Sequence, residues 1–236
     1  MEIGGIQKLT LIDYPGKVAC TVFLCGCNFR CPWCYSKELV LPEEIKKQPK
    51  ISEKEFFDFL KERKGLLEGV VICGGEPTIN KALPEFCEKI KKLGFLIKLD
   101  TNGSNPKMLK SLTSLPRSGS SLIDYVAMDV KLPKEKYSYS VGVKIDVKKI
   151  EESINVLKQG KIDYEFRTTV VPTVLDKEDI IEIAEWIKGA KRYYLQNFRA
   201  EKTINPKFEK IKPYPDKYLL EIQKTISPSF EICEIR

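Results

Sequence analysis

The order of apolar segments is the feature of this sequence that most restricts its fold. Six short runs of β-branched and apolar residues alternate with longer segments whose apolar residues recur at helical spacing. Strands that alternate regularly with helices form βαβ units and a parallel sheet. The predicted strands are 17–24, 69–74, 95–100, 124–130, 164–171 and 192–198, and the predicted helices are 52–63, 83–94, 105–113, 147–160 and 176–189.

The number of strands indicates the form of the sheet. Six strands are too few for a closed eight-stranded barrel and suit an open, curved one. The sequence therefore predicts the α/β class with an open partial (β/α)6 barrel. Because 236 residues without a linker or repeat suffice for one core, we expect a single domain over residues 1–236. Residues 113–121 are predicted to be a loop and residues 13–16 a tight turn.

Local signals mark several helix ends. Ser52 precedes a predicted helix and is followed three residues later by Glu55, which is the pattern of a capping box. Gly94 and Gly160 stand where a helix C-terminus favours a left-handed residue. These residues predict where three of the helices begin or end.

Composition narrows the class of protein. Hydrophobic residues make up 42% and charged residues 31%, as in soluble globular proteins. No apolar run approaches the roughly 18 residues of a membrane span, and the first residues lack the features of a secretory signal. We therefore expect a cytoplasmic protein without a membrane partner. The net charge of +7 is attributed to a lysine-rich surface and not to nucleic-acid binding, because no stretch interleaves basic and aromatic residues.

Cysteine and histidine usage restricts the chemistry. The chain has eight cysteines, five of them between residues 20 and 34, and no histidine. Disulfides are rare in cytosolic proteins, so the clustered cysteines indicate metal or cluster binding. Without histidine, a Ser–His or Cys–His catalytic pair and a zinc site with imidazole ligands are both excluded.

The segment "GCNFRCPWC" (26–34) places Cys27, Cys31 and Cys34 in a C-x3-C-x2-C pattern. A structural zinc ion with Cys20 or Cys25 as fourth ligand is one alternative. Structural zinc sites usually pair two C-x2-C segments, however, and this chain has only one. Three thiolates around a 4Fe–4S cluster with one open iron explain the spacing better. The role of Cys25, beside the motif, stays open.

Polar motifs follow the next predicted strands. "GGEP" (74–77) ends the second strand, "TNG" (101–103) the third and "DVK" (129–131) the fourth. In parallel sheets the carboxyl ends of the strands meet at one edge, where sites form. Gly74 and Gly75 permit close backbone approach, and Glu76 is an acceptor for a cationic or N–H group.

Several further residues are candidates for the same site. Asp129 and Lys131 lie on one face of an extended segment. Arg167 lies on a predicted buried strand, where an unpaired charge is costly. Thr101 and Asn102 either contact a ligand or form a turn. The cysteines outside the motif are interpreted as small buried hydrophobic residues, namely Cys20, Cys73, Cys87 and Cys233.

The C-x3-C-x2-C pattern with Trp33 before its last cysteine resembles the radical S-adenosylmethionine superfamily. The resemblance implies that Cys27, Cys31 and Cys34 bind a 4Fe–4S cluster. It implies that the amino and carboxylate groups of S-adenosylmethionine chelate the fourth iron. It also implies a set of cofactor-binding residues, namely Trp33, Gly74, Gly75, Glu76, Asn102, Asp129, Lys131 and Arg167.

Within this superfamily, "GGIQKLTLIDYPGK", "KLDTNGSNP" and "YYLQNFR" together look like anaerobic ribonucleoside-triphosphate reductase activating proteins. The resemblance implies reductive cleavage of S-adenosylmethionine and a glycyl radical on a partner enzyme, with a one-electron donor such as flavodoxin or ferredoxin. Relatives commonly read "CPYCHN" where this chain has "CPWCYS" (31–36), and they can carry histidine at the position of Gln196. Two alternatives are a radical enzyme acting on a small molecule, such as a deazapurine-pathway synthase, and a cluster- or zinc-stabilised binding module.

Overall fold

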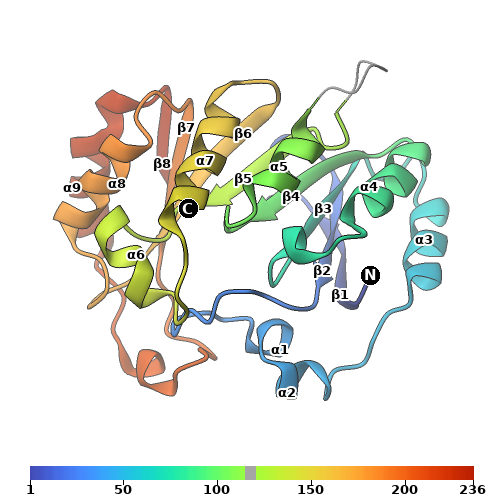
Figure 1. Cartoon of the computed structure of the whole chain (residues 1–236), viewed down its shortest axis with the longest axis horizontal. Coiled ribbons are helices and arrows are strands. Elements are labelled where there is room, and N and C mark those ends of the chain that lie inside the picture. Colours follow the sequence, from blue (N-terminus) through green and yellow to red (C-terminus); the bar gives the residue numbers. More distant parts are fainter. Residues whose placement is uncertain (115–120) are drawn as a thin grey trace.

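The computed structural model describes residues 1–114 and 121–236, without the side chains at 138 and 139. Within these residues the strands form one sheet in the order β1-β2-β3-β4-β5-β6-β7-β8 (Figure 1). The first strand runs antiparallel to the second, and every later neighbouring pair is parallel. The strands are β1 (Ile3–Thr10), β2 (Ala19–Leu24), β3 (Gly69–Gly74), β4 (Leu96–Thr101), β5 (Tyr125–Asp129), β6 (Asp163–Val170), β7 (Arg192–Asn197) and β8 (Ile232–Ile235).

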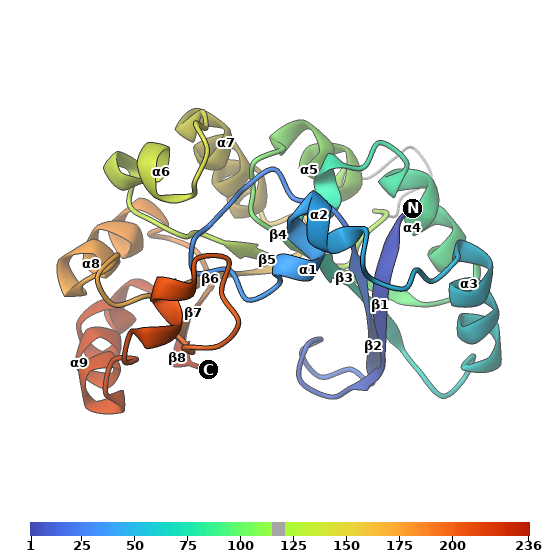
Figure 2. The same cartoon turned by 90° about the horizontal axis from the view of Figure 1, so that it is seen from below.

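Helices cover the outer face of the curved sheet. Figure 2 shows α3 to α9 in an arc around the strands, with the short α1 and α2 near the ends of β2 and β3. The helices are α1 (Lys37–Val40), α2 (Pro42–Ile45), α3 (Glu53–Glu62), α4 (Leu83–Lys92), α5 (Pro106–Thr113), α6 (Lys134–Ser140), α7 (Val147–Lys158), α8 (Lys177–Trp186) and α9 (Asp216–Ile226). Short 3-10 turns are η1 (Pro77–Ile79), η2 (Pro206–Lys210) and η3 (Ser227–Ser229). None of the helices described here is long and apolar enough to cross a membrane.

The predicted α/β fold with an open parallel sheet is confirmed. The six predicted strands correspond to β2 through β7, and all five predicted helices are present. The sheet extends further than predicted, with β1 at one edge and β8 at the other. The sequence gives a weak strand signal at both places, because β1 includes Gly4 and Gly5 and β8 has only four residues. Helices α6 and α9 were also not predicted.

The local predictions agree with the structure where it describes them. Ser52 and Glu55 form the capping box at the start of α3. Gly94 and Gly160 adopt positive φ after α4 and α7, as expected at helix C-termini. The predicted tight turn lies one residue later, at 14–17, where the amide of Lys17 donates to the carbonyl of Tyr14 at 3.1 Å. The central part of the predicted loop at 113–121, residues 115–120, lies outside the described residues.

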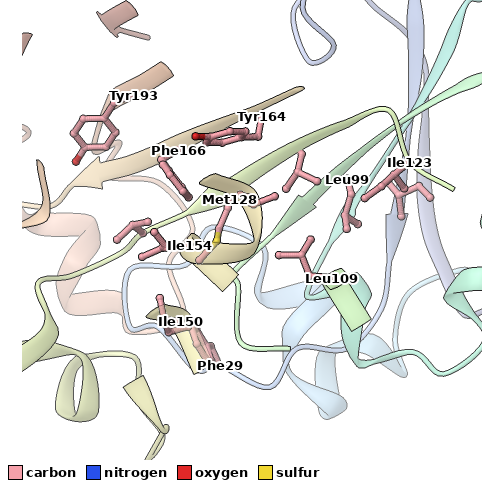
Figure 3. Packing of buried hydrophobic residues seen from close by; sticks show 14 of the residues in the cluster. Phe29, Leu99, Leu109, Ile123, Met128, Ile150, Ile154, Tyr164, Phe166 and Tyr193 are labelled. Carbon is pink, nitrogen blue, oxygen red and sulfur yellow. The ribbon is translucent and has the colours of Figure 1, made fainter. Parts of the chain in front are cut away.

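The two faces of the sheet have different chemistry. Figure 3 shows Leu99, Met128 and Phe166 packed on the side where Leu109 of α5 and Ile154 of α7 lie. These five side chains are at most 2% exposed. Since side chains alternate along a strand, the neighbouring residues point to the concave face. Most of those neighbouring residues are polar, so the concave face of the sheet is not a packing surface for a helix.

Gly74 and Gly75 bring the end of β3 against the start of the cysteine segment. A Cβ atom on Gly75 would lie 2.1 Å from the carbonyl oxygen of Gly26, and one on Gly74 would lie 2.2 Å from that of Leu24. Two backbone hydrogen bonds span the same contact, from Gly75 to Leu24 at 2.9 Å and from Glu76 to Gly26 at 2.8 Å. The two glycines are therefore required for the chain to pack on itself.

Gly75→Ala should destabilise the fold, because a Cβ atom cannot fit against the backbone of Gly26. Overpacking of this kind costs about 1–3 kcal/mol. The control is Gly5→Ala, whose Cβ atom would meet Phe23 at an ordinary 3.8 Å. Urea unfolding measures both free energies. A Gly75→Ala protein as stable as the Gly5→Ala control would contradict the close approach.

Candidate active site

One cavity of about 320 Å³ gathers the predicted site residues at the carboxyl ends of the strands. The segment after β2 and the ends of β3, β4, β5, β6 and β7 all contribute to its wall. Every predicted site residue lines the cavity except Glu76. The predicted residues in the wall are Cys27, Cys31, Trp33, Cys34, Gly74, Gly75, Asn102, Asp129, Lys131 and Arg167.

The three motif cysteines form one side of this cavity. Burial raises the pKa of Cys27 to about 11 and that of Cys31 to about 12, and it also raises the pKa of Cys34. The positive charge of Lys131 acts in the opposite direction on all three thiols. A cationic group at this position favours the thiolate forms that metal binding requires.

The cysteine segment is held in place by other parts of the chain. Arg30 donates from its backbone amide to the carbonyl of Val141 at 2.8 Å. On the other side, the amide of Ile204 donates to the carbonyl of Cys34 at 3.0 Å, and that of Asn205 donates to Pro32 at 2.9 Å. Contacts from segments far apart in sequence therefore hold the loop.

The three motif cysteines line one cavity without converging on a single ion-sized centre. Within residues 1–114 and 121–236, no three cysteine, aspartate or glutamate side chains are grouped closely enough to hold one ion. A zinc site requires its ligands to converge on one centre. In a 4Fe–4S cluster each thiolate binds a different iron, so the thiols can stand further apart around the cavity.

Cys25 lies away from the cavity. Its side chain is 6% exposed, and its Sγ atom accepts a hydrogen bond from Nζ of Lys50 at 3.7 Å. Lys50 also pairs with Glu2 at 3.0 Å.

The other cysteines outside the motif differ in their surroundings. Cys20 and Cys87 are fully buried, as the sequence predicts. Cys73 differs from its prediction as a purely packing residue, because it contributes to the cavity wall.

Glu76 is buried beside the cavity and bonded to the protein. Its carboxylate accepts hydrogen bonds from the amide of Thr78 at 3.0 Å, from Oγ1 of Thr101 at 2.7 Å and from the amide of Asn102 at 2.6 Å. Burial raises its pKa, and these hydrogen bonds act against that rise. Glu76 thus joins the segment after β3 to the end of β4, and its contact with a cofactor stays a prediction.

Asn102 forms the turn that the sequence left open as one of its two roles, and its contact with a ligand stays a prediction. Its side-chain oxygen accepts from the amide of Ser104 at 2.9 Å, which is a local turn. Its side-chain nitrogen donates to Oδ1 of Asn28 at 3.0 Å, which connects β4 to the cysteine segment. Asn102 also lines the cavity, so it can face a ligand while it holds the loop.

A chain of alternating charges crosses the concave face from β4 to the segment after β5. Lys98 pairs with Asp100, and Asp100 accepts from Nη1 of Arg167 at 3.0 Å. Nε of Arg167 donates to Asp129 at 2.9 Å, and Nζ of Lys131 lies 3.2 Å from Asp129. Each carboxylate therefore stands between two cations.

The ion pairs determine the charges in the cavity. Burial alone would raise the pKa of Asp129, but Arg167 and Lys131 hold it at about 2. Burial acts against the charged form of Lys131, yet Asp129 and the nearby thiols raise its pKa above the ordinary value. At neutral pH Asp129 is thus an anion between two cations, Lys131 and Arg167, in the cavity wall.

Part of this chain of alternating charges was not predicted from the sequence. The structure pairs Arg167 with Asp100 and Asp129 in the cavity wall, and its contact with a cofactor stays a prediction. Asp100 was not singled out. Lys98 and Asp100 are two residues apart on a strand that is otherwise apolar, so they share one face, and that pattern was the available signal.

Comparison with known proteins agrees with this geometry. Residues 21–187 match the family model described as the Radical SAM superfamily. This chain belongs to the radical SAM superfamily. It is an enzyme of this type, and the family implies the use of S-adenosylmethionine with a 4Fe–4S cluster.

Two related proteins have names that give different activities. A protein of Methanocaldococcus jannaschii named "Putative glycyl-radical enzyme activating enzyme MJ1227" is 34% identical over 241 residues, which cover 99% of this chain and 95% of that protein. The 7-carboxy-7-deazaguanine synthase of Thermococcus kodakarensis is 26% identical over 188 residues, covering 72% of this chain and 69% of the synthase.

A solved structure shares the fold. The crystal structure of Streptococcus suis SuiB bound to S-adenosylmethionine superposes with a TM-score of 0.61 at 13% identity. The superposition covers 91% of this chain and 51% of SuiB. At this identity the likeness concerns the fold alone.

Asp100→Asn should destabilise the protein strongly, because it leaves the ammonium of Lys98, 1% exposed, without its carboxylate. Removing one partner of a buried ion pair costs about 3–5 kcal/mol. Urea unfolding at pH 7 measures the loss. The control is Asp58→Asn on α3, which removes the partner of the exposed Lys54 and should leave the midpoint close to that of the unmodified protein. Equal midpoints for the two variants would contradict the role given to the charge chain.

Proposed function

We propose that this chain is a glycyl-radical enzyme activase whose partner is an anaerobic ribonucleoside-triphosphate reductase. One observation supports this proposal above the others. The three cysteines of the C-x3-C-x2-C motif line the same cavity as Asp129, Lys131 and the glycines at the end of β3. The similarity over almost the full length to a protein named as an activating enzyme supports the choice of reaction.

Cys27, Cys31 and Cys34 would hold the 4Fe–4S cluster, with each thiolate on a different iron. The donor set fits, since it consists of three cysteines with no competing histidine in the sequence. Cys25 is not needed as a fourth ligand, because its thiol is bonded to Lys50 outside the cavity. The fourth iron is then left for S-adenosylmethionine.

The other residues of the cavity would bind and orient S-adenosylmethionine. Gly74 and Gly75 present backbone without side chains at the cavity wall. Asp129 stays ionised and can accept hydrogen bonds from ribose hydroxyls, while Lys131 can neutralise the cofactor carboxylate. Arg167 and Asp100 hold Asp129 in position. When bound, the cluster and S-adenosylmethionine supply reductive cleavage of the cofactor and removal of a hydrogen atom from the substrate.

This chemistry also suggests an electron donor, a cellular compartment and a kind of substrate. A one-electron donor such as flavodoxin or ferredoxin would reduce the cluster in an anaerobic cytoplasm. The similarity to a deazaguanine synthase makes a small-molecule substrate the second candidate, although it covers 72% of this chain against 99% for the activating-enzyme relative.

Replacing each motif cysteine tests the assignment of the cluster ligands. Cys27→Ala, Cys31→Ala and Cys34→Ala should each abolish the visible absorbance of the protein reconstituted anaerobically with iron and sulfide. Cys25→Ala and Cys20→Ala should retain it, because their thiols lie outside the cavity. A bleached Cys25→Ala protein would replace the open-iron arrangement by a four-cysteine site.

The substrate is tested by mixing the reconstituted protein with the reductase under anaerobic, reducing conditions and S-adenosylmethionine. The proposal predicts a carbon-centred doublet in electron paramagnetic resonance, whose splitting changes when the glycine of the reductase is deuterated at Cα. A protein that cleaves the cofactor and turns over a deazapurine precursor, but gives no radical on the reductase, would select the small-molecule reaction.

A further inference from the structure

An apolar segment is exposed between β1 and β2. Leu9, Leu11 and Ile12 are 56%, 68% and 83% exposed. Only four other large hydrophobic residues in the described part of the chain are exposed, and they are scattered through the sequence. Three exposed apolar side chains within four residues are a feature that binding surfaces often have.

This segment borders a second hollow of about 710 Å³. Ile12, Asp13 and Pro15 form one wall of the hollow, and β6, β7 and Arg236 contribute to the rest. Figure 2 shows the β1–β2 connection below the sheet, on the open side across from the chain end after β8. The hollow therefore lies where the sheet does not close.

The second hollow adjoins the cysteine-lined cavity. Both are lined by the same five residues, namely Tyr35, Arg167, Thr169, Gln196 and Arg199. A group that enters past the apolar segment can therefore reach the cavity beside the cysteines.

The apolar segment is held in one conformation. The amides of Ile12 and Asp13 donate to Oγ1 of Thr10 at 3.4 and 3.2 Å. The carboxylate of Asp13 accepts from Oγ1 of Thr21 on β2 at 2.8 Å. These bonds hold the backbone of the segment while its apolar side chains are exposed. A prearranged surface of this kind loses little conformational entropy when a partner covers it.

One cation along the same route is available to a partner. Of the three arginines that line the second hollow, Arg167 and Arg236 pair with carboxylates. Arg199 has no carboxylate partner among the residues that the structure describes, and its guanidinium lies 5.5 Å from the ring centroid of Tyr35. Arg199 is exposed, so it can pair with an incoming carboxylate.

We propose that Leu9, Leu11, Ile12 and Arg199 form a docking surface for the protein that carries the substrate glycine. The occupant is a loop of the partner enzyme that enters the second hollow, with apolar side chains against the β1–β2 connection and a carboxylate for Arg199. This inference rests on the proposed activase function. A small-molecule substrate would not need the three exposed apolar side chains.

The test uses the double variant Leu11→Ser, Ile12→Ser in the full-length, reconstituted protein. Both side chains are exposed, so the variant should fold, and cleavage of S-adenosylmethionine in the absence of partner should be unchanged. The concentration of reductase that gives half-maximal glycyl-radical formation should rise at least tenfold. The matched control is Leu66→Ser, Leu220→Ser, which replaces exposed residues that line neither cavity and should not change this concentration.

The outcomes distinguish this inference from the proposed function. If the double variant activates the reductase at the same concentration as the unmodified protein, the docking surface is wrong and the activase function stands. If the unmodified protein forms no glycyl radical on the reductase, both proposals are rejected.

The contact between Arg199 and a carboxylate is tested by two substitutions. Arg199→Lys should reach half-maximal glycyl-radical formation at a lower reductase concentration than Arg199→Gln, because lysine keeps the positive charge. Equal concentrations would remove the carboxylate contact from the proposal.

Discussion

The pairing of Arg167 with Asp100 and Asp129 is the interaction on which the interior of this protein depends. Unpaired charges on the concave face would be costly, because a buried charge loses its hydration. The structure arranges them in alternating sign across three neighbouring strands, so that each has a partner. Asp100, Asp129 and Arg167 line the cavity beside the cysteines. The same pairs keep Asp129 ionised with its pKa at about 2.

The open form of the sheet gives this polar interior an entrance. The antiparallel β1 extends the sheet at one edge and β8 at the other, and the two edges are not paired with each other in the described residues. The second hollow lies at this opening and shares part of its wall with the cysteine-lined cavity. A closed barrel would admit only what passes through its ends. An open sheet can receive a loop of another protein, which is the kind of substrate that the proposed function requires.

The sequence predicts the repeating part of the fold well and its edges poorly. Strands β2 to β7 are recognisable because buried parallel strands are nearly continuous apolar runs. The capping box of Ser52 and Glu55 is local, so it needs no knowledge of the fold. By contrast, β1 is identified as a strand by its pairing with β2, and its own residues give little signal.

In the candidate site, too, local sequence patterns could be predicted and contacts between different strands could not. The spacing of Cys27, Cys31 and Cys34 is a local pattern, and the structure brings the three residues to one cavity. The position of Glu76 could not be derived from "GGEP", because its hydrogen-bond donors Thr101 and Asn102 belong to a different strand. Asp100, the partner of Lys98, is only two residues away on the same strand, so the alternation of side chains along a strand could have identified it.

The central claim is that three cysteines hold a cluster with one iron left for S-adenosylmethionine. It is tested most directly by electron paramagnetic resonance of the reduced, reconstituted protein before and after S-adenosylmethionine is added. The account predicts the signal of a reduced 4Fe–4S cluster, with g-values that change when the cofactor binds to the open iron. A signal that the cofactor leaves unchanged, or a colourless protein that binds one zinc ion, would contradict it.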